Sequence, residues 1–373
     1  MTTQQLVSQI KQKKSFLCIG LDVDLGKIPR HLLKLEDPFF EFNKAIIDAT
    51  HHLCVAYKPN TAFYEAYGLK GWQALEKTIS YINNKHPEIF TIADAKRGDI
   101  GNTSTMYAKA FLQDLAFDSV TVAPYMGKDS VEPFLDFKDK HTIMLALTSN
   151  EGAFDFQTLH VSDQELYKKV LQVSKSWRNS ENLMYVVGAT KAAYLKDIRS
   201  IVPDNFLLIP GVGTQGGSLK EIFDNGANNK IGLLVNSSRS IIYASKKEDY
   251  LIEAFKVAQK LQFEMKQLIL MFVLMTTSVA ANSLDIRGDA NVFSGKITTV
   301  TLTDDGGVIN VVGNTGKYGK VWLTYNLALD NPNHPTQGSF SGRATAINDE
   351  GARDAASRQG VWERKGNIIS LRK

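Results

Sequence analysis

Residues 89–102 read IFTIADAKRGDIGN, a short apolar run followed at once by two acidic and two basic side chains. The run IFTIA has the length and composition of a buried strand, and Asp94, Lys96 and Asp99 follow where it ends. Charges in such a place must be solvated or paired where little water is available. A surface loop joined by salt bridges is the alternative. A second lysine, Lys58, ends an earlier apolar run, and this favours an active site.

Seven further apolar runs alternate with amphipathic segments up to about residue 266. The eight expected strands are 15–21, 53–59, 89–94, 119–123, 142–148, 183–188, 205–210 and 231–236. Segments between them, such as 37–52 and 218–227, carry apolar residues at three- and four-residue spacing, as helices do. This order predicts a (β/α)₈ barrel, the TIM barrel. A doubly wound open sheet is the alternative, because periodicity alone does not show closure.

Polar residues at the ends of several expected strands favour the barrel. They are Asp22, Lys58, Asp94, Thr148, Ser149 and Arg239. In a barrel the carboxyl ends of the strands converge on one face, where the active sites of this fold lie. An open sheet would spread the same groups along an edge.

A glycine-rich turn, LLIPGVGTQGGSLKE at 207–221, follows the seventh expected strand and opens a helix. Its backbone amides can approach an anion closely, although a plain tight turn explains the glycines equally well. The next strand is followed by Arg239, which can make a two-pronged contact to phosphate. Loops after strands seven and eight often bind phosphate in barrels, so a phosphate site is expected here.

Charge and cysteine content narrow the class of partner. The formal net charge is +4, with 43 Lys and Arg against 39 Asp and Glu and no long basic run, so no nucleic-acid partner is expected. Cys18 and Cys54 each lie in an apolar run and are interpreted as buried thiols, which fits a reducing cytoplasm. The first residues, MTTQQLVSQIKQKK, lack the apolar segment of a secretory signal.

No metal cluster is expected from the histidines. His51 and His52 are adjacent on an expected helix, so their side chains point in different directions. His86, His141 and His160 fall in polar linkers, and all five are interpreted as structural or surface residues. Asp22 and Asp24 offer oxygen ligands for a divalent ion, but Asp22 suits a sugar hydroxyl equally well.

Six ordered motifs resemble the orotidine 5′-phosphate decarboxylase family, in particular its longer bacterial subgroup. They are GLDVD (20–24), YKPN (57–60), DAKRGDIGNTS (94–104), LTSNEG (147–152), PGVGTQGG (210–217) and NSSRSI (236–241). The resemblance covers residues 1–266. It implies a homodimeric barrel that converts orotidine 5′-phosphate to UMP and CO₂, the last step of de novo pyrimidine biosynthesis, without metal or organic cofactor.

The resemblance also implies roles for individual residues. Asp94 lies against the substrate carboxylate, Lys96 protonates C6, and Lys58 orients Asp94 and contacts the ribose. Asp99, Ile100 and Thr103 contribute to the active site of the neighbouring subunit. The remaining substrate contacts are Asp22 to the ribose and Ser149 to the pyrimidine. The phosphate is held by Gln215 and Arg239, with backbone amides near Gly213 and Ser238. The serines before Arg239 depart from the glycine expected in many relatives.

Two function classes compete with this interpretation. A metal-dependent sugar-phosphate decarboxylase or aldolase of the same barrel group can share a D-x-K-x-x-D pattern. A non-enzymatic nucleotide-binding module is the other alternative, in which the C-terminal part carries the role. The expected base contact Ser149 argues against the first, and the intact set of two lysines and two aspartates argues against the second.

The composition changes after residue 266. Residues 267–282 have the three parts of a secretory signal inside the chain, and the preferred interpretation is a joined gene whose apolar segment packs as a helix on protein. A membrane anchor is the third interpretation, but the apolar run from Leu268 to Ala281 is short for a membrane span. Residues 283–373 alternate short β-like runs with turn residues, which predicts a small antiparallel barrel or sandwich of unknown function. Its aromatic residues Trp322, Tyr325 and Trp362 are expected in the core.

Overall fold

The computed structural model describes residues 1–189, 192–211, 218–278, 294–303, 306–315, 319–328, 330, 337–347, 353–365 and 368–372. The chain divides into two compact units, Met1–Lys266 and Gln267–Lys373, and each is described by itself. 

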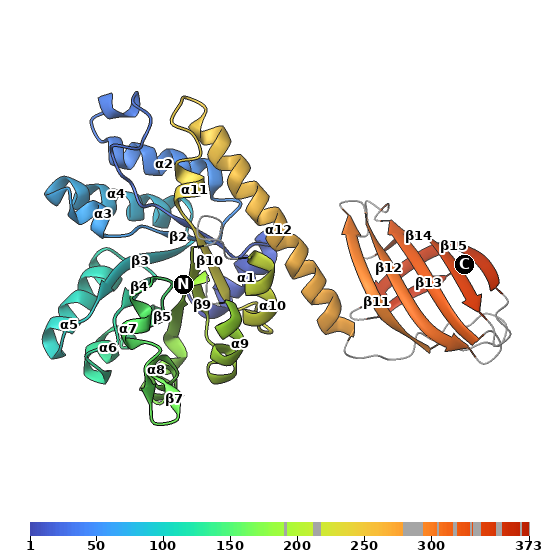
Figure 1. Cartoon of the computed structure of the whole chain (residues 1–373). Helices are drawn as coiled ribbons and strands as arrows, with labels where there is room; N and C mark the ends of the chain where they lie inside the picture. Colours follow the sequence, from blue (N-terminus) through green and yellow to red (C-terminus); the bar gives the residue numbers. More distant parts are fainter. Residues whose placement is uncertain are drawn as a thin grey trace. The chain divides into compact units, whose positions relative to one another are not determined.

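The first unit is a closed barrel of eight parallel strands (Figure 1). They are β1 (Leu17–Gly20), β2 (Ala56–Lys58), β3 (Phe90–Arg97), β4 (Ser119–Val122), β5 (His141–Leu147), β8 (Leu183–Val187), β9 (Leu207–Pro210) and β10 (Leu233–Ser237). The order around the barrel is β1-β10-β9-β8-β5-β4-β3-β2, so β1 pairs with both β2 and β10. All eight expected strands and the TIM barrel are confirmed, and closure excludes the open sheet.

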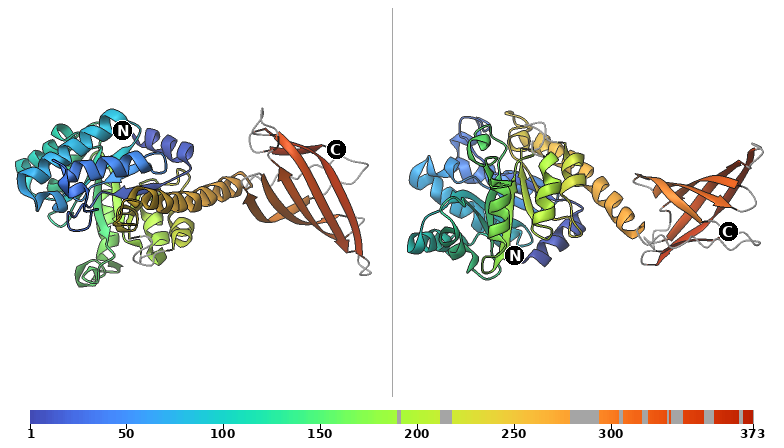
Figure 2. Two further views of the ribbon diagram at one scale, coloured as in Figure 1. Left: turned by 90° about the horizontal axis from the view of Figure 1, so that it is seen from above. Right: turned by 60° about the horizontal axis from the view of Figure 1, so that its bottom comes forward.

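Helices lie outside the ring of strands (Figure 1 and Figure 2). They are α1 (Thr3–Lys13), α2 (Pro38–Thr50), α3 (Ala62–Glu65), α4 (Gly68–Lys85), α5 (Gly101–Ala108), α6 (Lys128–Leu135), α7 (Ala153–Phe156), α8 (Leu166–Ser174), α9 (Ala192–Ile201), α10 (Leu219–Gly226), α11 (Arg239–Ile242) and α12 (Tyr250–Ser278). A π-helical segment, Lys109–Asp114, extends α5, and a small hairpin of β6 (His160–Val161) and β7 (Gln164–Glu165) precedes α8.

Local sequence explains where several helices begin. Thr2 and Gln5 form a reciprocal capping box at the start of α1. Asp37 accepts a hydrogen bond from the amide of Phe40, and Pro38 takes the first position of α2, where its missing N–H costs nothing. The strands themselves carry the core, since β1, β4, β8 and β10 are buried along their whole length.

The two cysteines lie in this core. Cys18 and Cys54 are free and buried, which confirms their interpretation as buried thiols. Burial raises the pKa of Cys54 to about 11, although Lys13 partly opposes this. A thiol of that kind is not a nucleophile at neutral pH.

Helix α12 runs for 29 residues and includes the first part of the signal-like segment. Met265 and Ile269 are buried, as expected for a helix that packs on protein. Among the described residues, no helix combines the length and hydropathy needed to cross a membrane. Residues 279–282 of that segment lie outside the described residues.

The second unit contains one six-stranded antiparallel sheet in sequential order. Its strands are β11 (Ser294–Thr303), β12 (Gly306–Thr315), β13 (Gly319–Ala328), β14 (Gln337–Ile347), β15 (Arg353–Lys365) and β16 (Ile368–Arg372). The antiparallel all-β class is therefore confirmed, with the strands joined as a simple meander.

The aromatic side chains of this sheet differ in burial, because successive residues of a strand point to opposite faces. Tyr325 and Trp362 are buried in a core with Val321 and Leu323. The prediction that Trp322 also belongs to the core is wrong, since its side chain is 38% exposed. Successive strand residues point to opposite faces, so Trp322, between two core residues, turns outward.

Candidate active site

Two lysines and one aspartate meet at the carboxyl ends of β2 and β3. Lys58 Nζ lies 2.6 Å from Asp94 Oδ2, and Lys96 Nζ lies 2.5 Å from Asp94 Oδ1. Each carboxylate oxygen thus has its own ammonium partner. The Lys58 side chain is 5% exposed and that of Asp94 11%, whereas Lys96 is 48% exposed. In this Lys58–Asp94–Lys96 array, Lys58 is therefore buried and Lys96 is accessible at the mouth of the barrel.

The backbone fixes Asp94 independently of its side chain. Its amide donates to the Pro59 carbonyl at 3.0 Å, and its carbonyl accepts from the Thr61 amide at 3.2 Å. Asn60 and Asp94 form an isolated parallel bridge just beyond the end of β2. The carboxylate is consequently held where strands β2 and β3 begin to separate.

Strand β3 is distorted where Lys96 leaves it. Lys96 has φ of +47°, the left-handed region that non-glycine residues rarely adopt, and the pairing with β4 shifts register between Ala93 and Arg97. Thr121 of β4 holds this distortion. Its Oγ1 accepts from the Lys96 amide at 2.9 Å and donates to Asp94 Oδ1 at 3.1 Å. Strained backbone of this kind clusters at functional sites.

The charges around Asp94 and Lys58 shift the pKa of each of these two groups. Burial alone would raise the pKa of Asp94, but Lys58 and Lys96 outweigh it and hold that pKa well below its ordinary value. Burial would lower the pKa of Lys58, but Asp94 and then Asp22 raise it above its ordinary value. At neutral pH the site therefore contains a carboxylate between two ammonium groups.

Asp22 follows β1 and faces the same charge array. Its Oδ1 is buried and has no hydrogen-bond partner among the described residues. The Asp22 carbonyl accepts from the Tyr243 hydroxyl at 2.8 Å, which fixes the backbone at this point. An unpaired buried carboxylate oxygen at a strand mouth suits a hydroxyl donor from a bound molecule.

Ser238, one of the serines that depart from the family pattern, lies beside Gly20 of β1. A Cβ on Gly20 would lie 1.8 Å from Ser238 Oγ, so no larger residue fits beside this serine. Ser238 Oγ also accepts a hydrogen bond from Asn236 Nδ2 at 3.1 Å. Gly20 pairs with Lys58 across β1 and β2, so this contact joins the Ser238 loop to the charged array.

The loop that carries Asp99 is anchored by Arg97. The Arg97 guanidinium forms an ion pair with Glu65 and lies 5.4 Å and 5.3 Å from the ring centres of Tyr107 and Phe111. Asp99 Oδ1 accepts from the Ile100 amide at 2.7 Å. The left-handed residues of this segment are Lys96 and Gly101.

The remaining predicted site residues divide into three groups. Ile100 and Thr103 lie at the start of α5 and are exposed. Ser149 follows β5 and packs against Gly188, and Arg239 begins α11 with its side chain exposed. Gly213 and Gln215 lie outside the described residues.

A family model for the orotidine 5′-phosphate decarboxylase / HUMPS family matches residues 15–253. The chain belongs to this family. A curated orotidine 5′-phosphate decarboxylase of Flavobacterium johnsoniae is 73% identical over 269 residues, which cover 72% of this chain and 98% of the relative. One from Christiangramia forsetii is 67% identical over 265 residues, covering 71% of this chain and 97% of the relative.

Solved structures of this family have the same barrel. The Leishmania donovani OMP decarboxylase matches with a TM-score of 0.60 and 35% identity, covering 70% of this chain and all of that one. The Plasmodium berghei orotidine 5′-monophosphate decarboxylase matches with a TM-score of 0.59 and 25% identity, covering 71% and 99%. The family matches therefore correspond to the barrel unit and leave the C-terminal sheet unmatched.

Sequence reasoning overlooked Thr121, which links Asp94 to the Lys96 backbone. Its only signal was a polar residue at an inward position of the buried strand SVTV. The expectation that the histidines form no metal cluster also needs correction. His51, His86 and Glu88 place their ligand atoms within 4.8 Å of one another, because the ends of α2 and α4 meet at the entrance to β3.

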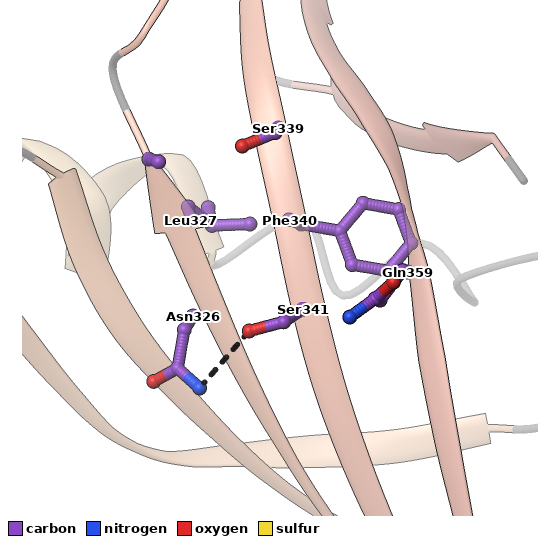
Figure 3. A pocket seen from close by; sticks show the side chains of 7 residues that line it. Asn326, Leu327, Ser339, Phe340, Ser341 and Gln359 are labelled. Carbon is purple, nitrogen blue, oxygen red and sulfur yellow. Dashed lines mark hydrogen bonds between the residues drawn. The ribbon is translucent and has the colours of Figure 1, made fainter.

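The C-terminal sheet has a hollow of its own (Figure 3). Its volume is about 470 Å³, and uncharged residues of β13, β14 and β15 line it, including Leu327, Phe340 and Gln359. Asn326 Nδ2 donates to Ser341 Oγ at 3.5 Å at its edge. Without a titratable side chain in its lining, this hollow offers no acid or base, unlike the barrel mouth.

Proposed function

We propose that the chain decarboxylates orotidine 5′-phosphate to UMP and CO₂, the last step of de novo pyrimidine biosynthesis. The Lys58–Asp94–Lys96 array is the observation that carries this conclusion. The curated relatives, matched over nearly their whole length at 67–73% identity, are orotidine 5′-phosphate decarboxylases. The chain is accordingly a carbon–carbon lyase.

The reaction requires a proton where CO₂ departs. The bond between C6 and the carboxyl carbon breaks, its electron pair stays at C6, and the Lys96 ammonium donates a proton to that carbon. Asp94 lies against the substrate carboxylate and stays ionised, because its pKa is held low. Fixed positive charge near the developing electron density stabilises the transition state. Since the two lysines supply that charge, the proposed reaction uses neither metal nor organic cofactor.

The rest of the nucleotide is bound away from the reacting carbon. Asp22 accepts from the ribose, and Ser149 contacts the pyrimidine edge. The phosphate contacts are assigned by the family pattern to Gln215, Arg239 and the backbone amides near Gly213 and Ser238. Binding energy from this remote group can position the reacting ring and drive loop closure. The exposed Arg239 side chain at the start of α11 is free to take a planar, two-pronged hold on phosphate.

We further propose a homodimer in which Asp99, Ile100 and Thr103 complete the neighbouring site. Apolar side chains exposed next to Asp99 support this surface: Ile100 is 59% exposed and Tyr125 is 92% exposed. The loop before Tyr125 touches the Asp99 loop, since a Cβ on Gly98 would lie 3.3 Å from the Ala123 carbonyl. Large apolar side chains gathered on a surface mark protein interfaces.

Mixing two inactive variants tests the shared site. Lys96→Ala and Asp99→Asn chains, each inactive alone, should regain activity when mixed, because one hybrid site per dimer keeps both residues. Exchange of subunits should be followed separately with tagged chains. Absence of recovery despite exchange would contradict the shared site.

In this proposal residues 1–266 are the catalytic domain and act in the cytoplasm. Residues 267–282 are the joining segment, and residues 283–373 are a separate small domain.

The decisive experiment measures the loss of orotidine 5′-phosphate by ultraviolet absorbance with purified full-length chain in EDTA. We expect turnover that EDTA does not reduce. Undetectable turnover, together with Mg²⁺-dependent turnover of a sugar phosphate, would replace this function with the metal-dependent alternative.

A further inference from the structure

Two histidines and a glutamate gather on the side of the barrel opposite the lysine array. His51 follows the last turn of α2, His86 follows α4, and Glu88 lies two residues before β3. Their ligand atoms all lie within 4.8 Å of one another. The strands are parallel, so these amino-terminal approaches face away from the carboxyl ends that carry the proposed active site.

The two imidazole rings are already close. Their centroids lie 4.1 Å apart with an interplanar angle of 30°. His86 Nε2 is buried and has no hydrogen-bond partner among the described residues, although buried ring nitrogens are normally satisfied. All three residues are only partly buried, so an ion from solvent can reach them.

A metal ion at this cluster would replace Lys13 as the partner of Glu88. Lys13 Nζ lies 3.7 Å from Glu88 Oε1 and donates to the carbonyl of His51 at 2.8 Å.

We propose that His51, His86 and Glu88 bind one Zn²⁺ ion, with water in the fourth position. Two imidazole nitrogens and one carboxylate oxygen form a donor set that Zn²⁺ takes in proteins with an open coordination position. Tetrahedral ligation at about 2.0–2.1 Å places ligand atoms roughly 3.4 Å apart. The ligand atoms, which now lie within 4.8 Å of one another, would move closer together on binding.

The ion would join the end of α2, the end of α4 and the approach to β3. Binding to the folded state alone stabilises it in proportion to ligand occupancy. Because the site is remote from Lys58, Asp94 and their substrate, we expect a gain in stability without a change in the decarboxylation rate. This inference does not depend on the proposed function.

The test uses the full-length chain stripped with EDTA and returned to a buffer that does not bind metal. Titration with ZnSO₄, followed by calorimetry, should give one equivalent per chain, and saturating Zn²⁺ should raise the melting temperature by about 5 °C. Co²⁺ should produce the visible absorption of a four-coordinate site. Mg²⁺, which prefers six oxygen ligands, should do neither.

Variants locate the ion. Loss of even an outer partner of a ligand costs about 10–100-fold in metal affinity, so His51→Gln and His86→Gln should each weaken Zn²⁺ binding at least tenfold. Glu88→Gln, a smaller change, should also weaken it and remove the Co²⁺ absorption. His52→Gln is the matched control, since this exposed neighbour of His51 is outside the cluster and should bind as the unaltered chain does.

Three results would overturn the proposal. These are absence of saturable Zn²⁺ binding, unchanged affinity in folded His86→Gln or Glu88→Gln chains, and equal loss in His52→Gln. Circular dichroism establishes that each variant is folded. If the histidine variants unfold, the Co²⁺ spectrum of Glu88→Gln decides the question by itself.

Discussion

Thr121→Val removes one hydroxyl and keeps the shape of the side chain. That hydroxyl donates to Asp94 Oδ1 at 3.1 Å and accepts from the Lys96 amide at 2.9 Å. Thr121 therefore acts as a positioning residue that fixes both the carboxylate and the left-handed turn at Lys96. The valine variant should keep the barrel fold and lose alignment of the two reacting groups.

The size of the loss follows from the two hydrogen bonds. A hydrogen bond to a charged group contributes about 1.5–3 kcal/mol, and an unpaired buried amide costs about 1–3 kcal/mol. Asp94 keeps its two lysine partners, so only part of this loss reaches the transition state. We expect kcat/KM to fall by about 10–100-fold, which equals roughly 1.4–2.8 kcal/mol. The free energy of unfolding should fall by about 1–3 kcal/mol.

The ultraviolet assay for orotidine 5′-phosphate measures this change, with Thr121→Ser as the matched control. Serine retains the hydroxyl, so its kcat/KM should stay close to that of the unaltered chain. The reduction in the valine variant should lie mainly in kcat, because Thr121 positions the reacting groups and is assigned no substrate contact. A folded Thr121→Val chain with unchanged kcat/KM would refute the reasoning, as would equal damage in Thr121→Ser.

Three further changes test other parts of the account. Burial opposes the ionisation of Asp94, but Lys58 and Lys96 outweigh it and lower the pKa of this carboxyl in the folded state. Ionised Asp94 therefore stabilises the fold at pH values above its unfolded pKa of ~3.9. That stabilisation is lost as the pH falls toward the lower pKa of the folded state. Urea unfolding at successive pH values should show this acid-side slope in the unaltered chain and a flatter one in Asp94→Asn. Gly20→Ala would place a Cβ 1.8 Å from Ser238 Oγ, which should cost about 1–3 kcal/mol in unfolding experiments and raise KM; Ser238→Gly in the same chain should restore both. A chain that ends at Ser278 should keep kcat/KM within about twofold in the ultraviolet assay, because a relative matched over 98% of its length needs no such C-terminal sheet.

The sequence predicted the barrel well because its signals are local. Each strand is a short apolar run, and several of these runs end in a polar group at the same face. The resemblance of the motif 94–104 to a known family then assigned Asp94 and Lys96 their roles. Closure itself required the structure, because the pairing of β1 with β10 joins residues more than 200 positions apart.

Features that depend on neighbouring strands were not predictable. The left-handed turn at Lys96 arises from the register shift against β4 and the hydrogen bond to Thr121, and neither leaves a pattern in residues 94–99. The histidine–glutamate cluster likewise forms only where α2 and α4 end together. Trp322 was misplaced because its aromatic character was given more weight than its position between two core residues.

The central claim is that the Lys96 ammonium, held by Asp94 at the barrel mouth, donates the proton that replaces CO₂. Turnover of orotidine 5′-phosphate by full-length Lys96→Ala, measured beside the unaltered chain, tests it most directly. General acid catalysis contributes about 10²–10⁴-fold, and loss of the fixed charge adds to that. We therefore predict a fall in kcat of at least about 10³-fold in a folded Lys96→Ala chain. A folded Lys96→Ala chain that keeps kcat within tenfold of the unaltered chain would contradict the account.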